Sequence, residues 1–141
     1  MYAEGLGVQQ DYKEAISWYR KAAEQGHKLA QYNLGSYYEN GKGVAQNYEQ
    51  AVKYYRLAAA KNVTNAQIKL GLAYGQGKGV EQSFLQAYKW IFIAAQTGNS
   101  IAKEALEMTA EYMTQEQIAE AIKLAKEEKI EKEEGNNPTI Q

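Results

Sequence analysis

Residues 38–51 read YENGKGVAQNYEQA, and this stretch returns at a fixed interval. Residues 74–87 read YGQGKGVEQSFLQA and residues 2–15 read YAEGLGVQQDYKEA, so successive copies lie 36 positions apart. A fixed period of about 20–50 residues is the signature of a solenoid or of a linear array of repeats. Because the stretch occurs three times, it belongs to the scaffold of a repeat rather than to a unique active site.

The Gly-Lys-Gly core of this stretch raises the alternative of a phosphate-binding loop. Such a loop needs a glycine, four residues and then Gly-Lys-Ser/Thr, directly after a strand. Here Ser36 and Leu72 stand where the first glycine belongs, and Gly43 and Gly79 follow the lysines in place of Ser or Thr. The first copy has Leu6 instead of lysine. The stretch therefore does not predict nucleotide binding.

Composition excludes several classes of protein. A chain of 141 residues with a net charge of −1 is one ordinary domain without the basic surface that nucleic-acid binding needs. No run of about 20 apolar residues predicts insertion into a membrane. The absence of cysteine excludes disulfides and thiolate chemistry. No signal peptide is visible at the N-terminus, and localisation is not predicted.

Each repeat predicts a pair of helices. In the second unit the first helix spans about residues 28–40, with Ala30, Leu34 and Tyr38 on one face. Gly35 and Gly71 recur inside these helices, where glycine costs about 1 kcal/mol against alanine, so we expect a neighbouring helix to approach closely there. The Gly-x-Gly segment that follows predicts a turn that needs positive φ.

The second helix of each unit has its own start and stop signals. Asp11, Asn47 and Ser83 are the predicted N-caps. Three residues that tolerate the left-handed C-cap conformation end these helices: Gly26, Asn62 and Gly98. In the last unit the Thr114–Gln117 segment predicts a capping box, and the apolar stripe after it predicts a helix that closes the stack. That stripe consists of Ile118, Ala121, Ile122 and Ala125.

The pattern over residues 1–112 resembles the Sel1-like repeat (SLR) family, which is related to the tetratricopeptide repeats. The second and third units match at Ala30, Leu34, Gly35, Tyr38, Gly41, Gly43, Val44, Ala51, Tyr54, Ala58 and Ala59, and at Ala66, Leu70, Gly71, Tyr74, Gly77, Gly79, Val80, Ala87, Trp90, Ala94, Ala95 and Gly98. The resemblance implies an all-α, α/α superhelical solenoid that acts as an adaptor or scaffold. We expect one domain over 1–134, with units at 1–28 (truncated), 29–64, 65–100 and 101–134 (degenerate), and a disordered tail at 135–141.

The resemblance also implies where a partner binds. In related folds the first helix of each pair lines a concave groove that holds a protein or peptide segment. The predicted groove residues are Leu29, Tyr32, Asn33, Ser36, Asn40, Asn65, Ile68, Lys69, Leu72, Gln76, Glu104 and Met108. The alternative is that the apolar members of this set pack against neighbouring helices.

Catalytic and metal sites are not predicted. His27 is the only histidine, and no cysteine or second histidine can complete a metal site with it. Glu24, Glu39 and Glu49 lie on polar helix faces without a nucleophile or base arranged around them. The sequence therefore predicts no enzyme and no cofactor, and a weak hydrolase is the least favoured alternative.

The first unit begins in the middle of its first helix, at Met1 and Tyr2. Its second helix therefore lacks a partner and has an apolar flank. Such an edge predicts a homo-oligomer in which a second copy docks head to tail, and a self-assembling structural role is the main alternative to the groove.

Overall fold

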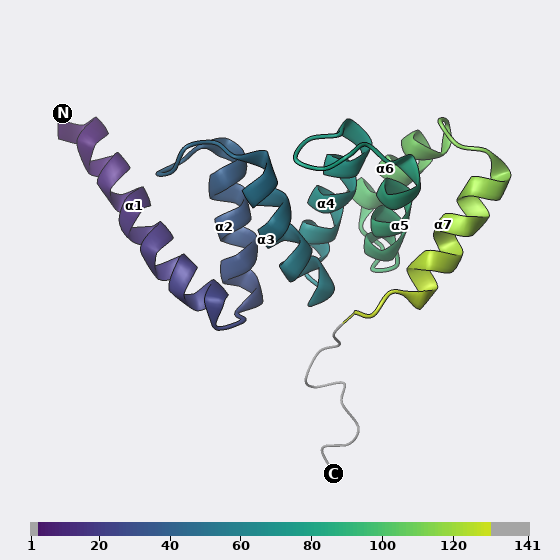
Figure 1. Ribbon diagram of the computed structural model, residues 1–141, viewed down its shortest axis with the longest axis horizontal. Helices are drawn as coiled ribbons and strands as arrows, with labels where there is room; N and C mark the ends of the chain where they lie inside the picture. The colour runs from purple at the N-terminus through teal and green to yellow at the C-terminus, as the bar shows by residue number, and fades with distance from the viewer. Residues whose placement is uncertain (1–2, 131–141) are drawn as a thin grey trace, which may run out of the picture.

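The computed structural model describes residues 3–130, which form seven helices and contain no strand (Figure 1). The helices are α1 (Ala3–Glu24), α2 (Lys28–Asn40), α3 (Tyr48–Ala60), α4 (Thr64–Gln76), α5 (Phe84–Ala95), α6 (Ser100–Ala110) and α7 (Gln115–Glu127). From α1 to α6 each helix packs against the next along the long axis of the molecule, whereas α7 packs against α5. The predicted all-α solenoid of helix pairs is confirmed, while the predicted tail at 135–141 lies outside the described residues.

The predicted N-caps are confirmed for the later units. The Asn47 side chain accepts a hydrogen bond from the backbone N–H of Gln50 at 3.0 Å, and Ser83 accepts one from Gln86 at 3.1 Å. Thr114 and Gln117 form a full capping box at the start of α7. Each cap satisfies a backbone donor that the helix itself leaves unpaired.

Asp11 is not an N-cap, and this prediction is wrong. Residues 3–24 form one continuous helix, so the glycine segment at 5–8 is helical instead of a turn. In the later units the turn packs on the second helix of the preceding unit. A Cβ on Gly43 would lie 2.7 Å from the Ile16 side chain of α1, and one on Gly79 would meet Tyr48 and Val52 of α3. Within the described residues, no helix of a preceding unit packs against the segment at 5–8. This segment therefore continues the helix instead of forming a turn.

The predicted close approach at two helix glycines is confirmed. A Cβ on Gly35 would lie 2.8 Å from the Tyr55 ring, and one on Gly71 would lie 2.5 Å from Ile91. Real Cβ atoms do not approach neighbours this closely. Glycine at these positions therefore allows the two helices of one unit to lie in contact.

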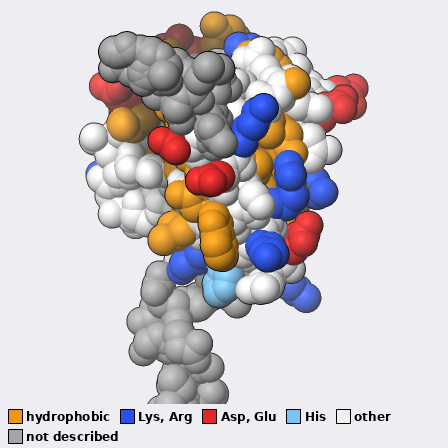
Figure 2. Space-filling model, turned by 90° about the vertical axis from the view of Figure 1, so that its left-hand side faces the viewer, with side chains coloured by type: hydrophobic (Ala, Val, Ile, Leu, Met, Phe, Trp, Pro, Cys, Tyr) orange, Lys and Arg blue, Asp and Glu red, His pale blue; other side chains and the backbone are white. Residues whose placement is uncertain are grey.

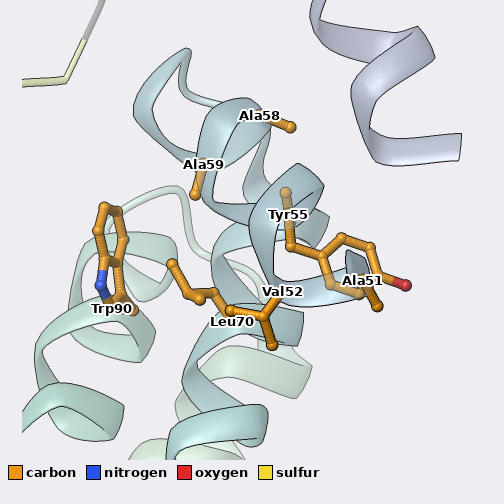
Figure 3. Packing of buried hydrophobic residues seen from close by; sticks show 8 residues of the cluster. Ala51, Val52, Tyr55, Ala58, Ala59, Leu70 and Trp90 are labelled. Carbon is orange, nitrogen blue, oxygen red and sulfur yellow. The ribbon is translucent and has the colours of Figure 1, made fainter. Parts of the chain in front are cut away.

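The core runs between the helix pairs. Figure 3 shows the central cluster, in which Leu70 lies between Trp90 and Val52 and the Ala58–Ala59 pair lies against the same group. Full burial of one large apolar side chain stabilises the fold by about 1.5–3 kcal/mol. A second cluster joins α1, α2 and α3, and a third joins α4, α5 and α6, so every junction between units contains buried apolar side chains.

Two buried glutamines lie at equivalent junctions between units, and they were not predicted from the sequence. The Gln31 side chain donates to the carbonyl oxygen of Ala23 at 3.2 Å, and Gln67 donates to Ala59 at 3.1 Å. Each side chain donates to a carbonyl near the end of the preceding helix, which also accepts a backbone N–H three residues on: that of Gly26 for Ala23 and that of Asn62 for Ala59. The sequence signal that could have predicted these contacts is a glutamine at the equivalent position of two successive units.

The helix predicted from the last apolar stripe is present as α7 and packs against α5. Ala121 and Ala125 are buried against the rest of the molecule. The Lys89 ammonium lies 2.6 Å from a carboxylate oxygen of Glu128, just after α7. The side chains that α7 exposes are mostly polar or charged, among them Gln115, Glu116, Glu120, Lys123 and Lys126.

Candidate functional site

The face lined by α2, α4 and α6 contains two pockets. The first, which we call the charged pocket, lies between α2 and α4 with α3 as its floor, and has a volume of about 130 Å³. Its lining includes Glu39 from α2, Tyr48 and Tyr55 from α3, Lys69 from α4 and Lys78 from the loop after α4. Ala51, Val52, Leu72, Ala73 and Gln76 complete it.

A hydrogen-bonded carboxylate lies in the charged pocket. The Tyr55 hydroxyl donates to a carboxylate oxygen of Glu39 at 2.6 Å, and the Lys69 ammonium lies 3.5 Å from the same oxygen. Burial raises the pKa of the Tyr55 phenol, and the hydrogen bond to Glu39 raises it further. Tyr55 therefore remains a neutral donor. In Figure 3 its hydroxyl points away from Leu70 and Trp90, so the ring belongs to the core and the hydroxyl belongs to the pocket.

A second cation lies at the edge of the charged pocket. Lys78 is exposed, and its ammonium lies 5.4 Å from the centre of the Tyr48 ring. A cation over an aromatic face is weakly attracted by the ring quadrupole. The contact holds the ammonium near the pocket without neutralising its charge.

The second pocket, which we call the apolar pocket, lies between α4 and α6 with α5 as its floor. It has a volume of about 170 Å³. The Phe84 and Tyr112 rings stack at its side, with centroids 4.9 Å apart and planes 7° from parallel. The other side chains around it include Leu72, Gln76, Ala87, Ile91, Ala105, Met108 and Thr109. Leu72 and Gln76 of α4 line both pockets, so the two are neighbours on either side of α4, and we call the pair together the groove.

Four of the predicted groove residues line these pockets: Lys69, Leu72, Gln76 and Met108. Leu72 and Met108 are 39% and 65% exposed, which is high for large apolar side chains. Of the other predicted residues, Leu29, Asn40, Asn65 and Glu104 are exposed, and Tyr32, Asn33 and Ser36 are half-buried; none of these seven lines either pocket.

Ile68 lies in the core rather than on the groove surface. Its side chain is only 7% exposed and packs with Ile91 and Ala102. Tyr32 is intermediate, since its ring lies 5.6 Å from that of Tyr55. For Ile68 the alternative of packing against neighbouring helices therefore describes the structure, because α4 is rotated so that this side chain points toward α5 and α6.

Several pocket residues were not predicted. Glu39 was assigned to a polar helix face without an arranged partner, yet it bonds Tyr55 and Lys69. Phe84 and Tyr112 were not considered for the groove. The signal that could have found them is the equivalence of Tyr48 and Phe84 in successive units, each one position after the N-cap of a second helix.

Outside these two pockets, a third pocket of about 410 Å³ lies between α5 and α7, lined by Asn62, Phe92, Ile93, Gln96, Thr97, Ala125, Lys126 and Ile130. Within residues 3–130, no three His, Cys, Asp or Glu side chains are grouped so that they could hold a metal ion. Among the helices of this part of the chain, none is both long enough and apolar enough to cross a membrane. His27 is exposed in the turn before α2.

Stacked helix pairs, turns with left-handed glycines and a groove along the first helices define a helical solenoid repeat protein. The chain belongs to the Sel1 repeat family, whose family model matches residues 1–27, 28–63 and 64–99. Sel1 repeats generally mediate protein interactions and are usually non-catalytic.

Solved structures show the same fold. A protective antigen of uropathogenic Escherichia coli, which displays an SLR fold, is 35% identical with a TM-score of 0.83 over 87% of this chain and 27% of that one. A Sel1 repeat protein from Oxalobacter formigenes is 38% identical with a TM-score of 0.70, over 83% of this chain and 47% of that one. The chain therefore spans less than half the length of either.

A curated viral protein is also similar over a short segment. A putative sel1-like repeat-containing protein of Acanthamoeba polyphaga mimivirus is 50% identical over 40 residues, which is 28% of this chain and 8% of that protein. This match is about the length of one repeat.

Proposed function

We propose that this chain is a protein-interaction module that holds a segment of a partner protein in the groove formed by the charged and apolar pockets. The observation that carries the proposal is the exposure of Leu72 and Met108, one on each of two neighbouring first helices, beside the stacked pair of Phe84 and Tyr112. A helix face that contacts only water does not require a row of large apolar side chains. A groove of this kind suits an extended peptide or a partner helix whose side chains enter successive pockets.

The test is a selection of binding peptides with a matched pair of variants. Twelve-residue peptides are selected from a displayed random library on the wild-type chain, and their affinities are measured by fluorescence polarisation. Leu72→Asp places a charge in the groove, and we expect affinity to fall at least about tenfold, since burying an unpaired charge is costly.

Leu57→Asp is the control. Leu57 is 41% exposed, nearly the same as Leu72, but lies on α3 and lines neither pocket. The Leu57 variant should bind like the wild type, and circular dichroism should show both variants folded. Equal loss in the two variants, or no loss in either, contradicts the groove as the binding face.

A second candidate function is self-assembly through α1. Trp18 is 72% exposed, whereas its equivalents one and two units later, Tyr54 and Trp90, are 8% and 3% exposed. The later two are covered by the preceding helix pair, and no helix pair within the described residues covers Trp18. Figure 2 views this end of the molecule, where apolar side chains lie among charged ones.

The occupant we propose for this face is the α1 face of a second copy. The outward side of α7 is mostly polar, so pairing two α1 faces buries more apolar surface than the predicted head-to-tail contact. Sedimentation equilibrium should show a dimer that Trp18→Ala dissociates. A wild-type monomer at concentrations of about 100 μM, where even weak specific contacts form, contradicts this candidate.

A further inference from the structure

The two pockets occupy equivalent positions of successive repeats. Eight residues of the charged pocket have a counterpart 36 positions later in the apolar pocket. The pairs are Glu39 and Gly75, Tyr48 and Phe84, Ala51 and Ala87, Tyr55 and Ile91, Lys69 and Ala105, Leu72 and Met108, Ala73 and Thr109, and Gln76 and Tyr112. The groove therefore presents one architectural pocket twice, with different side chains.

The differences between the two linings follow one direction. Both charged side chains of the pairs are lost, since Gly75 stands for Glu39 and Ala105 for Lys69. Phe84 and Ile91 stand at the positions of Tyr48 and Tyr55, so the second pocket lacks both of these phenolic hydroxyls. The alanine of the floor is the same in both pockets, as Ala51 and Ala87. Two hydroxyls are gained, those of Thr109 and Tyr112. The Thr109 hydroxyl donates to the Ala105 carbonyl of its own helix at 2.8 Å, and the Tyr112 ring stacks on Phe84. The second pocket is thus specialised for an apolar group.

The charged pocket carries more positive than negative charge. Glu39 is its one carboxylate, and it already accepts a hydrogen bond from Tyr55 and an ion pair from Lys69. Lys78 adds a second cation at the rim, whose contact is an aromatic ring rather than a carboxylate. A bound carboxylate would meet two ammonium groups and one carboxylate that is already engaged. Charge complementarity therefore favours an acidic ligand group over a basic one.

We propose that the groove recognises two nearby side chains of one bound segment: an aspartate or glutamate in the charged pocket and a large aliphatic or aromatic residue in the apolar pocket. This inference rests on the proposed function, because it assigns chemistry to the same groove. Leu72 and Gln76 line both pockets, so both side chains can belong to one short segment. The partner is thus a protein with an exposed acidic and hydrophobic segment.

The probe is the set of twelve-residue peptides selected on the wild-type chain. We expect Asp or Glu to be enriched within a few residues of Leu, Met, Phe or Trp. In a synthetic peptide of this kind, exchange of the acidic residue for Lys should weaken binding about fivefold or more, as loss of a surface ion pair and gain of repulsion require. Exchange of the apolar residue for Ser should weaken it at least tenfold.

Two pairs of protein variants assign each side chain to its pocket. Lys78→Glu should remove the preference for the acidic peptide over its Lys counterpart. Lys42→Glu, the same substitution one repeat earlier, should not, since Lys42 is equally placed over the Tyr12 ring at 5.8 Å but lines neither pocket. Met108→Lys should reduce affinity at least tenfold, whereas Ile101→Lys, at a residue 63% exposed on the same helix, should not.

The outcomes separate the two proposals. If Leu72→Asp and Leu57→Asp behave alike, the groove is not the binding face and both proposals fail. If only Leu72→Asp loses binding but selected peptides lack an acidic residue, or Lys78→Glu leaves the acidic preference intact, the groove stands and the assigned chemistry is overturned. Selection of basic peptides overturns the charge assignment in the same way.

Discussion

Tyr55 contributes to the fold and to the groove at once. Its ring is buried in the central cluster, where it fills the space left by the missing side chain of Gly35, and its hydroxyl donates to Glu39 in the charged pocket. A buried donor left without an acceptor costs about 1–3 kcal/mol, so Glu39 also stabilises the fold. This residue ties the position of the pocket carboxylate to the packing of α2 on α3.

The raised pKa of Tyr55 predicts a specific loss of stability at high pH. The phenol is protonated in the folded chain well above its unfolded pKa of about 10, so its contribution is complete below pH 10 and is lost as pH rises above that value. At pH 8 the wild type should exceed Tyr55→Phe by about 1–2 kcal/mol in free energy of unfolding. Above pH 10 this difference should shrink by about 1.4 kcal/mol per unit.

Urea denaturation of both chains between pH 8 and pH 11 measures that difference. The comparison cancels the titration of the remaining tyrosines and lysines, since both chains share them. A difference that stays constant across this range would show that Tyr55 ionises as easily in the folded as in the unfolded chain.

At the scale of the element, local chemistry made the later helices predictable. Asn47, Ser83 and Thr114 cap helices because an oxygen of each side chain reaches a backbone N–H three residues on, which needs no knowledge of the rest of the fold. The helix at 3–24 was mispredicted because its expected turn depends on contact with another helix. The segment at 5–8 has the same two glycines as the later turns, but within the described residues it has no contact with the second helix of a preceding unit.

Helix α4 gives a matched test of close packing. Gly71→Ala would place a Cβ 2.5 Å from Ile91 and 3.1 Å from the Ala87 carbonyl oxygen, so we expect a loss of about 1–3 kcal/mol. Gly75→Ala, one turn later, would place its Cβ at 3.8 Å from Ala87, an ordinary contact. Because alanine favours helix over glycine, this control should be neutral or up to about 1 kcal/mol more stable.

Chemical denaturation of the two alanine variants checks the order. Equal stability of both variants would mean that α4 and α5 separate easily, and that glycine at position 71 is not needed for their packing.

At the scale of the whole molecule, the groove arises from stacking and could be predicted only in part. Helix periodicity predicted Leu72, Gln76, Lys69 and Met108 as groove residues, and these four side chains line the two pockets. It missed the Glu39–Tyr55–Lys69 cluster, whose members come from three helices and meet only after the units stack. It also misplaced Ile68, because helix periodicity fixes which residues share a face but not how far the helix is rotated.

The first and last helices of the described residues differ in which side chains they expose. At one end Trp18 is exposed where its equivalents are buried, and at the other α7 buries Ala121 and Ala125 and presents polar side chains. The groove lies between these ends, over α2 to α6. Binding in the groove and pairing through α1 would therefore use separate surfaces, and a dimer could hold two segments.

The most direct test of the groove is a methyl NMR titration of the wild-type chain with a selected peptide. The predicted result is a shift of the Leu72 and Met108 methyl signals, which line the pockets, while those of Leu57 and Ile101, similarly exposed but outside them, remain in place. Shifts at Leu57 and Ile101 with none at Leu72 and Met108 would contradict the groove as the binding face.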